Sequence, residues 1–432
     1  MKTVRCVSLG CPKNLIDTEV MLGKLARAGH KILDESRTNA APDIWLINTC
    51  CFIKEAEAES LDTINKAVKS GCGQVVVAGC LVQRNPGLIR SRFGKSVFAI
   101  AGVFERDNIV EICGGLAVKT AVSEPPKLCR DDTLRLRITP GHFAYLRVAE
   151  GCNNRCSYCV IPSIHGGYRS KSPKIIVKEA KELAESGVRE LNIIAQDTTS
   201  YRYGNTDLSD ILELLCKIDG IRWIRLLYTH PAHYSSRLIK AVAELPKIVK
   251  YLDLPVQHIS DRILKRMGRR VTKHRIIELI SELRLKIPGL FIRSTIIVGF
   301  PGETEYDFQE LTDFLGQANF ERLGAFQYSQ EPGTRAAKMG GQLTNKIKQA
   351  RFDAVMSLQQ SIAFDHNRQL IGKKIEIIID SITDNDYIGR TYGDAPEVDG
   401  CIFISSKRRL KTGDILKAEI NGSKNYDLTG IV

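Results

Sequence analysis

The chain has 432 residues, of which 43% are hydrophobic and 26% are charged. These proportions are typical of a globular protein and exclude a disordered or collagen-like chain, and the length predicts two or three domains. The apolar runs are shorter than the roughly 18 residues needed to span a bilayer, and no apolar segment follows Lys2 and Arg5 as a signal peptide would require. We therefore expect a cytoplasmic protein with no membrane partner.

The cysteine content gives the first indication of chemistry. Thirteen cysteines in a cytoplasmic chain of this size favour metal or redox chemistry over a disulfide framework. The net charge of +13 allows nucleic acid or a ribonucleoprotein as a partner, but solvated charge without such a role is the commoner explanation at this level. Charge alone does not identify the partner.

The first 122 residues alternate short, β-branched apolar runs with segments of helical periodicity. Alternation of this kind predicts a parallel, doubly wound sheet. A charged segment that begins Ser-Glu-Pro-Pro follows at residues 123–140, and we interpret it as a linker. We expect strands at 4–9, 44–48 and 75–78, and helices at 14–28 and 55–69.

The alternation continues in residues 141–367, where helical patterns separate six expected strands. Six βα units predict a partial or open barrel with its chemistry at the carboxyl ends of the strands. In residues 368–432, short strands alternate around Gly and Asp turns, which predicts a small β-barrel. The strands expected in these two regions lie at 144–148, 191–195, 224–227, 251–254, 292–298, 323–326, 374–379, 387–390, 401–404 and 415–420.

Three cysteines, Cys152, Cys156 and Cys159, stand close together just after the first strand of the central region. A short polar loop has no interior in which to bury three thiols, and thiolates are the ligands of iron–sulfur cubanes. A cubane has four irons, so three cysteines would leave one iron open. The alternative is a zinc site, which would need a fourth protein ligand, and His165 is the candidate nearby. The spacing favours the cluster.

A second trio is widely separated in the sequence. Cys11, Cys50 and Cys80 each lie at the carboxyl end of an expected parallel strand and just before a helix. Such ends meet at one edge of a parallel sheet, which predicts a second three-cysteine cluster. Cys51 adjoins Cys50 and could exchange roles with it. Because successive side chains of an extended segment point in opposite directions, only one of the two can face the cluster.

These features resemble those of a known enzyme family. The Cys-x3-Cys-x2-Cys loop is similar to the signature of the radical S-adenosylmethionine (radical SAM) enzymes, the amino-terminal trio resembles their methylthiotransferase branch, and the carboxy-terminal module resembles a TRAM domain. The resemblance implies two 4Fe-4S clusters, with Cys50 rather than Cys51 as a ligand, and S-adenosylmethionine bound at the cluster of the central region. Matching segments lie at 8–14, 48–50, 79–80, 299–304 and 328–334.

Some members of this family methylthiolate a modified adenosine of tRNA, and others an aspartate of the small-subunit ribosomal protein numbered twelve. Residues 10–14, 191–199 and 390–400 resemble the enzymes that act on the ribosomal protein. The resemblance therefore implies a transferase that adds a methylthio group to the β-carbon of that aspartate. A tRNA methylthiotransferase is the nearest alternative, and a non-catalytic iron–sulfur carrier or RNA-binding scaffold is a more distant one.

The charge of the last region favours the same choice. Residues 368–432 carry 10 basic and 10 acidic residues, whereas a module that grips RNA should be basic. Asp394, Glu397 and Asp399 form an acidic patch, which we predict to dock a basic ribosomal protein. On the residues alone, the alternative that these acids are ordinary turn residues around Pro396 stays open.

The resemblance also implies a mechanism. The β-carbon hydrogen of an aspartate is not acidic enough for base chemistry, so its replacement by sulfur calls for a radical. The cluster in the central region would receive one electron from an electron donor protein and cleave S-adenosylmethionine, and the amino-terminal cluster would supply the methylated sulfur. Gln196 and Gln257, each just past an expected strand, are candidates for hydrogen bonds to the cofactor or the substrate.

Overall fold

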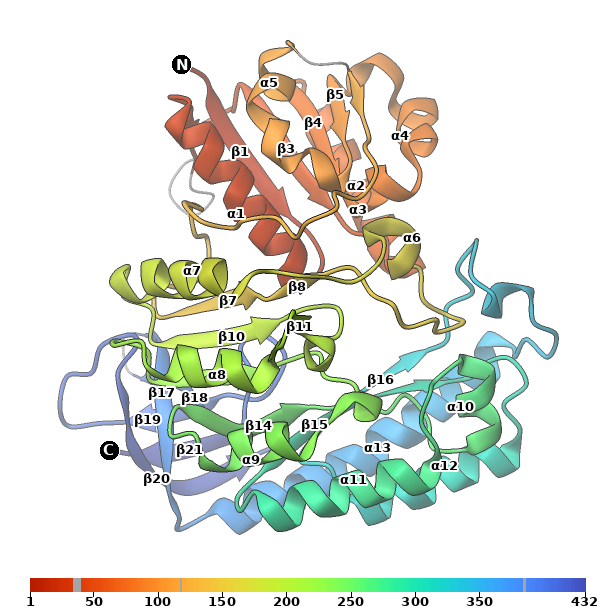
Figure 1. Cartoon of the computed structure of the whole chain (residues 1–432), viewed down its shortest axis with the longest axis vertical. Helices are drawn as coiled ribbons and strands as arrows, with labels where there is room; N and C mark the ends of the chain where they lie inside the picture. Colours follow the sequence, from red (N-terminus) through yellow and green to blue (C-terminus); the bar gives the residue numbers. More distant parts are fainter. Residues whose placement is uncertain (34–39, 117–118, 384–385) are drawn as a thin grey trace.

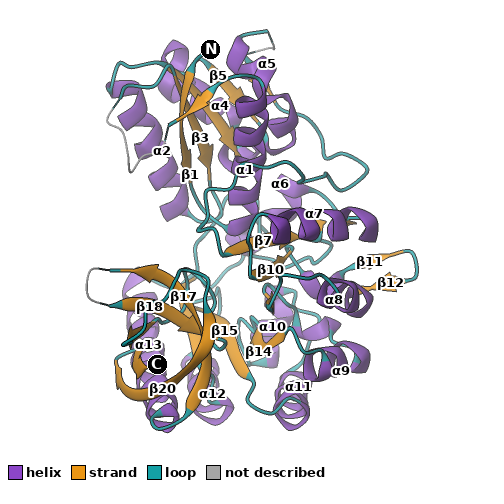
Figure 2. Ribbon diagram, turned by 90° about the vertical axis from the view of Figure 1, so that its left-hand side faces the viewer, coloured by secondary structure: helices purple, strands orange, loops and turns teal. Residues whose placement is uncertain are grey.

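The computed structural model describes residues 1–33, 40–116, 119–383 and 386–432. It has three parts, each built around one sheet (Figure 1). The amino-terminal sheet lies above the central sheet, and the carboxy-terminal barrel packs beside the central sheet (Figure 2). This arrangement confirms the predicted fold class. In the described part of the chain, no helix has the length and apolar character needed to span a bilayer.

The amino-terminal part is a six-stranded parallel sheet in the order β2-β1-β3-β4-β5-β6. Neighbouring residues of β3 and β4 alternate between two apolar clusters, because successive side chains point to opposite faces. Helices therefore cover both faces, as the alternation predicted. The strands are β1 (Thr3–Ser8), β2 (Lys31–Ile32), β3 (Ile44–Thr49), β4 (Gln74–Gly79), β5 (Ala99–Ala101) and β6 (Thr120–Ala121). The helices are α1 (Pro12–Arg27), α2 (Lys54–Lys69), α3 (Cys80–Arg84), α4 (Pro86–Phe93) and α5 (Ile109–Gly114).

The central part is a second six-stranded parallel sheet, in the order β16-β15-β14-β13-β10-β7. Its edge strands β7 and β16 do not pair, so the barrel is open, as predicted. The strands are β7 (Phe143–Arg147), β10 (Glu190–Ile194), β13 (Trp223–Leu226), β14 (Ile248–Asp253), β15 (Phe291–Val298) and β16 (Arg322–Gln327). The short strands β8 (Ala149–Glu150) and β9 (Arg169–Ser170) form one ribbon, and β11 (Arg202–Tyr203) and β12 (Thr206–Asp207) form another.

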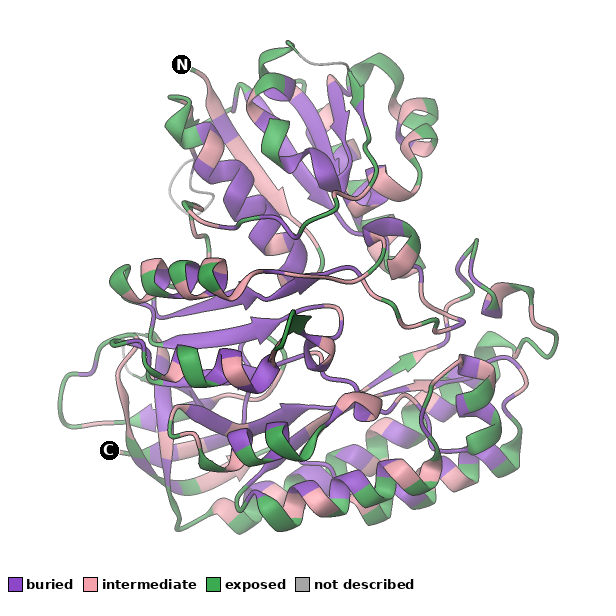
Figure 3. Cartoon of the chain, in the orientation of Figure 1, coloured by how far each residue is buried: buried purple, intermediate pink, exposed green. Residues whose placement is uncertain are grey.

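Helices line the outer face of the central sheet, with their solvent-facing sides exposed (Figure 3). Both large sheets are buried in the same view. The helices are α6 (Ile161–His165), α7 (Pro173–Glu185), α8 (Leu208–Cys216), α9 (Ser236–Glu244), α10 (Asp261–Met267), α11 (Lys273–Lys286), α12 (Glu305–Ala318) and α13 (Asn345–Leu370).

The carboxy-terminal part is a closed five-stranded barrel in the order β17-β18-β19-β21-β20. The small barrel was predicted, but its last strand was not. The strands are β17 (Lys374–Ile382), β18 (Tyr387–Thr391), β19 (Ile402–Ser405), β20 (Ile415–Lys424) and β21 (Asp427–Ile431).

One apolar cluster joins all three parts. It contains Ile16 of α1, Tyr145 of β7 and Ile378 of β17, all buried. The inner face of the central sheet is therefore covered by α1 at one end and by the barrel at the other. The segment between β6 and β7, residues 122–142, forms no helix or strand. We propose domains at residues 1–122, 141–367 and 368–432, although the last of these boundaries lies within α13.

Candidate active site

The three amino-terminal cysteines lie at one edge of their sheet. Cys11 precedes α1, Cys50 follows β3 and Cys80 opens α3 after β4, and these strands are parallel neighbours. Gly10 has a φ of +87°, and a Cβ there would lie 2.7 Å from Sγ of Cys50, so glycine is needed for the thiol to fit. Burial raises the pKa of the Cys50 and Cys80 thiols, which interact electrostatically with Cys11. Thiols in this setting ionise when they bind a metal.

Cys51, the neighbour of Cys50, packs into an apolar cluster. Its side chain is fully buried in this cluster with Ile47 and Leu61, and burial raises its pKa to about 12. Its carbonyl oxygen accepts a hydrogen bond from Arg84 over 2.8 Å. Cys80 packs against the same cluster, and Cys51 lies within electrostatic range of its thiol. Cys50 rather than Cys51 as the ligand therefore stays a prediction.

The loop of the central trio is held against α10. The amide of Ser157 donates a hydrogen bond to the carbonyl oxygen of Met267 over 2.8 Å. Burial raises the pKa of the Cys159 thiol to about 12, and Cys156 and Cys152 lie within electrostatic range of it. A donor set of three thiols fits a cubane that keeps one iron open.

His165 does not complete the donor set of Cys152, Cys156 and Cys159. It ends α6, which follows Cys159, and its Nε2 lies 3.6 Å from Sγ of Cys80 in the amino-terminal trio. Burial lowers the pKa of His165 to about 4. The zinc alternative therefore loses its candidate ligand, and α6 instead connects the two trios, lying beside α3 at the junction of the first two parts (Figure 1).

Lys13 is a site residue that the sequence analysis missed. Its side chain is 8% exposed, and its Nζ lies 3.4 Å from the carbonyl oxygen of Ala195 and 3.0 Å from the ring centre of Tyr228. Cys11 and Asp253 interact with it electrostatically, but among the described residues no carboxylate lies within ion-pair distance. Lys13 thus reaches from the amino-terminal trio to the strand ends of the central sheet. Its place two residues after Cys11 was the available signal.

Buried polar groups without protein partners gather at the carboxyl end of the central sheet. Among the described residues, the side-chain oxygens of Gln196 and Gln257 have no hydrogen-bond partner, and neither amide atom of Asn192 on β10 has one. Gln257 has a φ of +71°, in the left-handed region that non-glycine residues seldom adopt. Unsatisfied buried groups are costly, so we expect these side chains to form hydrogen bonds to a bound ligand. Gln196 and Gln257 remain predictions, and Asn192 was not predicted.

Asp197 connects this strand end to the cluster loop. Its carboxylate accepts hydrogen bonds from Asn154 over 2.7 Å, Ser200 over 2.8 Å and His233 over 2.8 Å. His230 lies nearby, and the possible metal-ligand atoms of Asp197, His230 and His233 all lie within 4.8 Å of one another. Because the carboxylate already has these partners, it is suited to positioning the loop between Cys152 and Cys156. Sequence reasoning did not single out this group, since its members meet only in the fold.

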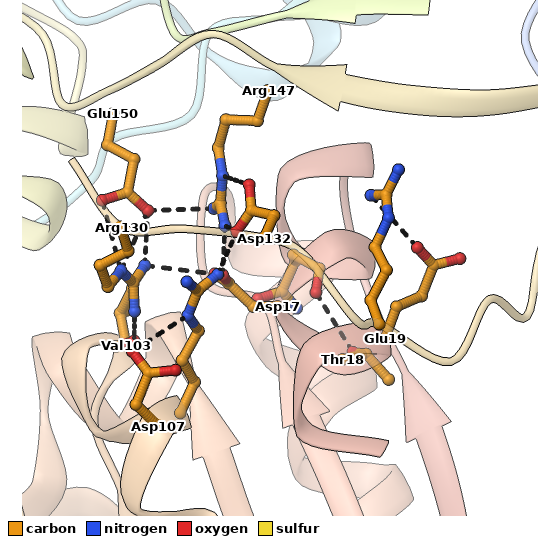
Figure 4. Close-up of polar contacts among 12 residues, drawn as sticks. Asp17, Thr18, Glu19, Val103, Asp107, Arg130, Asp132, Arg147 and Glu150 are labelled. Atoms are coloured by element: carbon orange, nitrogen blue, oxygen red, sulfur yellow. Dashed lines mark hydrogen bonds and ion pairs between the residues drawn. The ribbon is translucent and has the colours of Figure 1, made fainter. Parts of the chain in front are cut away.

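A buried ion network fixes the two cysteine-bearing parts to each other (Figure 4). Arg147 on β7 contacts Asp17 on α1 at 2.8 Å and Asp132 at 2.6 Å. Arg106 also pairs with Asp17, at 3.0 Å, and with Asp132. Arg130 pairs with Glu150 of β8 at 2.6 Å. The predicted linker therefore forms part of the contact between the two sheets.

The prediction that Asp394, Glu397 and Asp399 form an acidic docking surface on the barrel is wrong, because two of the three are buried. Asp394 is 2% exposed, and the side chain of Asp399 is 4% exposed. Each forms an ion pair with an arginine of the central sheet, at 2.7 and 3.3 Å. Glu397 is exposed, but its carboxylate accepts a hydrogen bond from a tyrosine hydroxyl over 2.6 Å. These acids attach the barrel to the central sheet through Arg322, Arg293 and Tyr145.

Three family models match the chain. They are "Radical SAM superfamily" over residues 146–315, "TRAM domain" over residues 371–432, and "Uncharacterized protein family UPF0004" over residues 3–101. Together they cover each of the three parts of the structure.

Relatives over the whole length are named "Ribosomal protein uS12 methylthiotransferase RimO". The protein of Desulforamulus reducens is 43% identical, over 100% of this chain and 99% of its own. That of Lachnoclostridium phytofermentans is 43% identical over 98% of each chain. That of Clostridioides difficile is 41% identical, over 100% of this chain and 99% of its own.

Solved structures share the fold at low sequence identity. The radical S-adenosylmethionine methyltransferase TsrM of Kitasatospora setae superposes with a TM-score of 0.59 at 15% identity, covering 77% of this chain and 76% of that one. The S-adenosylmethionine radical enzyme OxsB gives 0.55 at 14% identity, covering 83% of this chain and 56% of that one. The arrangement of a parallel sheet domain beside an open barrel is therefore one that radical SAM enzymes use.

Proposed function

The chain belongs to the RimO family of ribosomal protein uS12 methylthiotransferases, and we propose that it adds a methylthio group to the β-carbon of an aspartate in ribosomal protein uS12. One observation carries the proposal. Two three-cysteine sets lie at the carboxyl ends of two parallel sheets. His165, which follows the central set in the chain, contacts Cys80 of the other set, and Lys13 reaches the strand ends of the central sheet. An enzyme that both generates a radical and delivers sulfur needs two such sites within reach of one substrate.

The cysteines of each set would hold a 4Fe-4S cluster. Cys11, Cys50 and Cys80 would bind the first, and Cys152, Cys156 and Cys159 the second, where S-adenosylmethionine would also bind. With S-adenosylmethionine, the second cluster supplies the one-electron cleavage that yields a radical able to remove an unactivated hydrogen.

The protein's own groups position this chemistry. Asp197 holds the cluster loop through Asn154, while the unsatisfied amides of Gln196, Gln257 and Asn192 offer hydrogen bonds to the cofactor or the substrate. Side chains of α1 and the barrel pack against the central sheet, where they would limit the access of water to the reaction.

A tRNA methylthiotransferase is a second candidate, which one feature of the barrel favours. Several of its acids, among them Asp394 and Asp399, face the central sheet, and basic residues gather elsewhere on the barrel. A groove of about 590 Å³ there is lined by Lys374, Lys407, Arg408 and Lys417 with a single acid, Glu419. Basic grooves of this kind suit RNA phosphates. The carrier alternative is weaker, since each donor set supplies three thiols and leaves an iron open.

The partners follow from the same proposal. The substrate is uS12, free or in a ribosomal particle, and an electron donor protein supplies the electron. The reaction takes place in the cytoplasm without a membrane partner.

Mass spectrometry of ribosomal proteins and tRNA from a deletion strain tests the function. The uS12 protein should lose the mass of one methylthio group and regain it on complementation with the wild-type gene. Neither a Cys11, Cys50 and Cys80 triple alanine variant nor a Cys152, Cys156 and Cys159 triple alanine variant should restore it. Loss of a methylthio group from tRNA, with uS12 unchanged, would instead establish the second candidate.

A further inference from the structure

A surface groove of about 800 Å³ borders the loop that carries the central cysteine trio. Arg155, which lies between Cys152 and Cys156, forms one wall, and residues in and after α10 form the other. The groove has a strongly basic lining with a single acid, Asp261. Its basic residues are Arg155, Lys265, Arg269, Arg270, Arg275 and Arg335.

Most of this positive charge is not neutralised within the protein. Arg155, Lys265, Arg270 and Arg335 are exposed, and none forms an ion pair with a carboxylate of the described residues. Arg275 does, with Glu278 at 2.9 Å. Several like charges around one concave surface repel one another and raise the local concentration of anionic partners. The groove is therefore suited to a partner with an acidic face.

The groove also lies directly against the cysteine loop. The carbonyl oxygen of Arg155 lies 2.7 Å from where a Cβ on Gly268 would stand, so the two backbones are in close contact. The Arg335 guanidinium donates a hydrogen bond to the same carbonyl oxygen. Arg269 extends inward from the groove and interacts with Cys156. A partner seated here would come close to Cys152, Cys156 and Cys159.

We propose that this groove docks an acidic one-electron donor protein, with a reduced flavin or an iron–sulfur centre. The inference rests on the proposed radical chemistry, which needs one electron per cleavage. The donor is oxidised by one electron, which passes through the site of Cys152, Cys156 and Cys159 to the sulfonium of S-adenosylmethionine. The sulfonium's carbon–sulfur bond then breaks to give methionine and the 5′-deoxyadenosyl radical. Electron transfer slows steeply with distance, so a groove whose wall is the cysteine loop is suited to it.

The test reverses two charges whose side chains form no hydrogen bond or ion pair with the described residues. Lys265→Glu with Arg270→Glu should lower the rate of S-adenosylmethionine cleavage driven by a reduced acidic flavodoxin by about tenfold or more at low salt, because steered association depends on complementary charge. Cleavage driven by dithionite, a small reductant that needs no docking surface, should be unchanged. The affinity for flavodoxin should fall in parallel, and the difference from wild type should shrink as salt is added.

Lys174→Glu with Lys181→Glu is the matched control. These exposed lysines lie on α7, away from α10 (Figure 1), and the change in net charge is the same. A loss of flavodoxin-driven cleavage no greater than in this control would overturn the inference. An equal loss of dithionite-driven cleavage would also overturn it, since Lys265 and Arg270 would then affect the cluster site itself.

An RNA partner is the competing occupant. Weaker binding of a 16S ribosomal RNA fragment by Lys265→Glu with Arg270→Glu, with flavodoxin-driven cleavage unchanged, would make the groove an RNA interface and overturn the inference. All these readouts are cleavage and binding, not methylthiolation. A failure to modify uS12 would therefore count against the proposed function and leave this result standing.

Discussion

Cys50 and Cys51 are neighbours in sequence and both are buried, but they have different contacts. Cys50 meets Gly10 at the sheet edge, whereas Cys51 is sealed among apolar side chains. We expect Cys51→Ala to keep both clusters, about eight irons per chain for two cubanes, and Cys50→Ala to keep about four. Iron analysis of anaerobically reconstituted protein measures the difference. Loss of iron from the Cys51 variant alone would reverse the assignment.

Lys13 brings an amine to the junction between the amino-terminal trio and the central sheet, and burial lowers the pKa of that amine. The carboxylate of a substrate aspartate would give it the ion-pair partner that the described chain does not supply, and a buried unpaired charge is costly. We expect Lys13→Met to retain both clusters and dithionite-driven cleavage of S-adenosylmethionine, but to lower methylthiolation of uS12 by at least tenfold. Lys13→Arg should recover part of the activity. Full activity in the Lys13→Met variant would show that Lys13 does not bind the substrate carboxylate.

At the scale of elements, the sequence predicted the long strands and the positions of the cysteines at their ends. Strands such as β4 and β15 are runs of β-branched residues, and their order along the chain fixes which ends meet. The short strands were missed because nothing local marks them. β5 is only Ala99–Ala101, and β21 mixes Asp, Thr and Gly with its apolar residues.

The sequence predicted only part of the candidate site, as it predicted only part of the strands. Cysteines are rare enough that their placement stands out, whereas Lys13, Asn192 and Asp197 acquire meaning only from contacts across the fold. The acidic patch failed for this reason. A count of charges in the barrel cannot tell which of its acids face the central sheet.

The barrel's attachment provides a prediction at this scale. Asp394 pairs with Arg322 at 2.7 Å, and both are buried. Asp394→Ala would leave the guanidinium buried without its partner, which typically costs about 3–5 kcal/mol. We expect the barrel to unfold at a lower urea concentration. Tryptophan fluorescence measures this, because the Trp223 indole donates a hydrogen bond to Glu376 of the barrel. Glu419→Ala, at an exposed position of β20, is the control and should have a much smaller effect. Equal effects of the two changes would contradict the role given to the buried pair.

At the scale of the whole molecule, the network of Figure 4 determines how the two cysteine sets face each other. Asp132 lies at its centre, and it contacts Arg147 at 2.6 Å and Lys171 at 2.8 Å. Removing one member of a buried ion network leaves its partners uncompensated. Asp132→Ala should therefore lower the free energy of unfolding by about 3–5 kcal/mol, whereas Asp62→Ala, which breaks the exposed pair with Lys66, should change it by about 0.5 kcal/mol or less.

The same network makes the molecule sensitive to acid. Burial alone would raise the pKa of Asp132, but Arg147, Lys171 and Arg106 outweigh it and hold that pKa well below its usual value. A carboxyl whose pKa is lower in the folded state stabilises the fold above its unfolded pKa, about 3.9 for Asp. That contribution is lost as the pH falls through the folded pKa. We expect stability to decline below about pH 4 in the wild type, measured by urea unfolding across pH. In Asp132→Asn the decline should be shallower, because the amide has no proton to gain. An unchanged pH profile in that variant would show that other carboxylates govern acid unfolding.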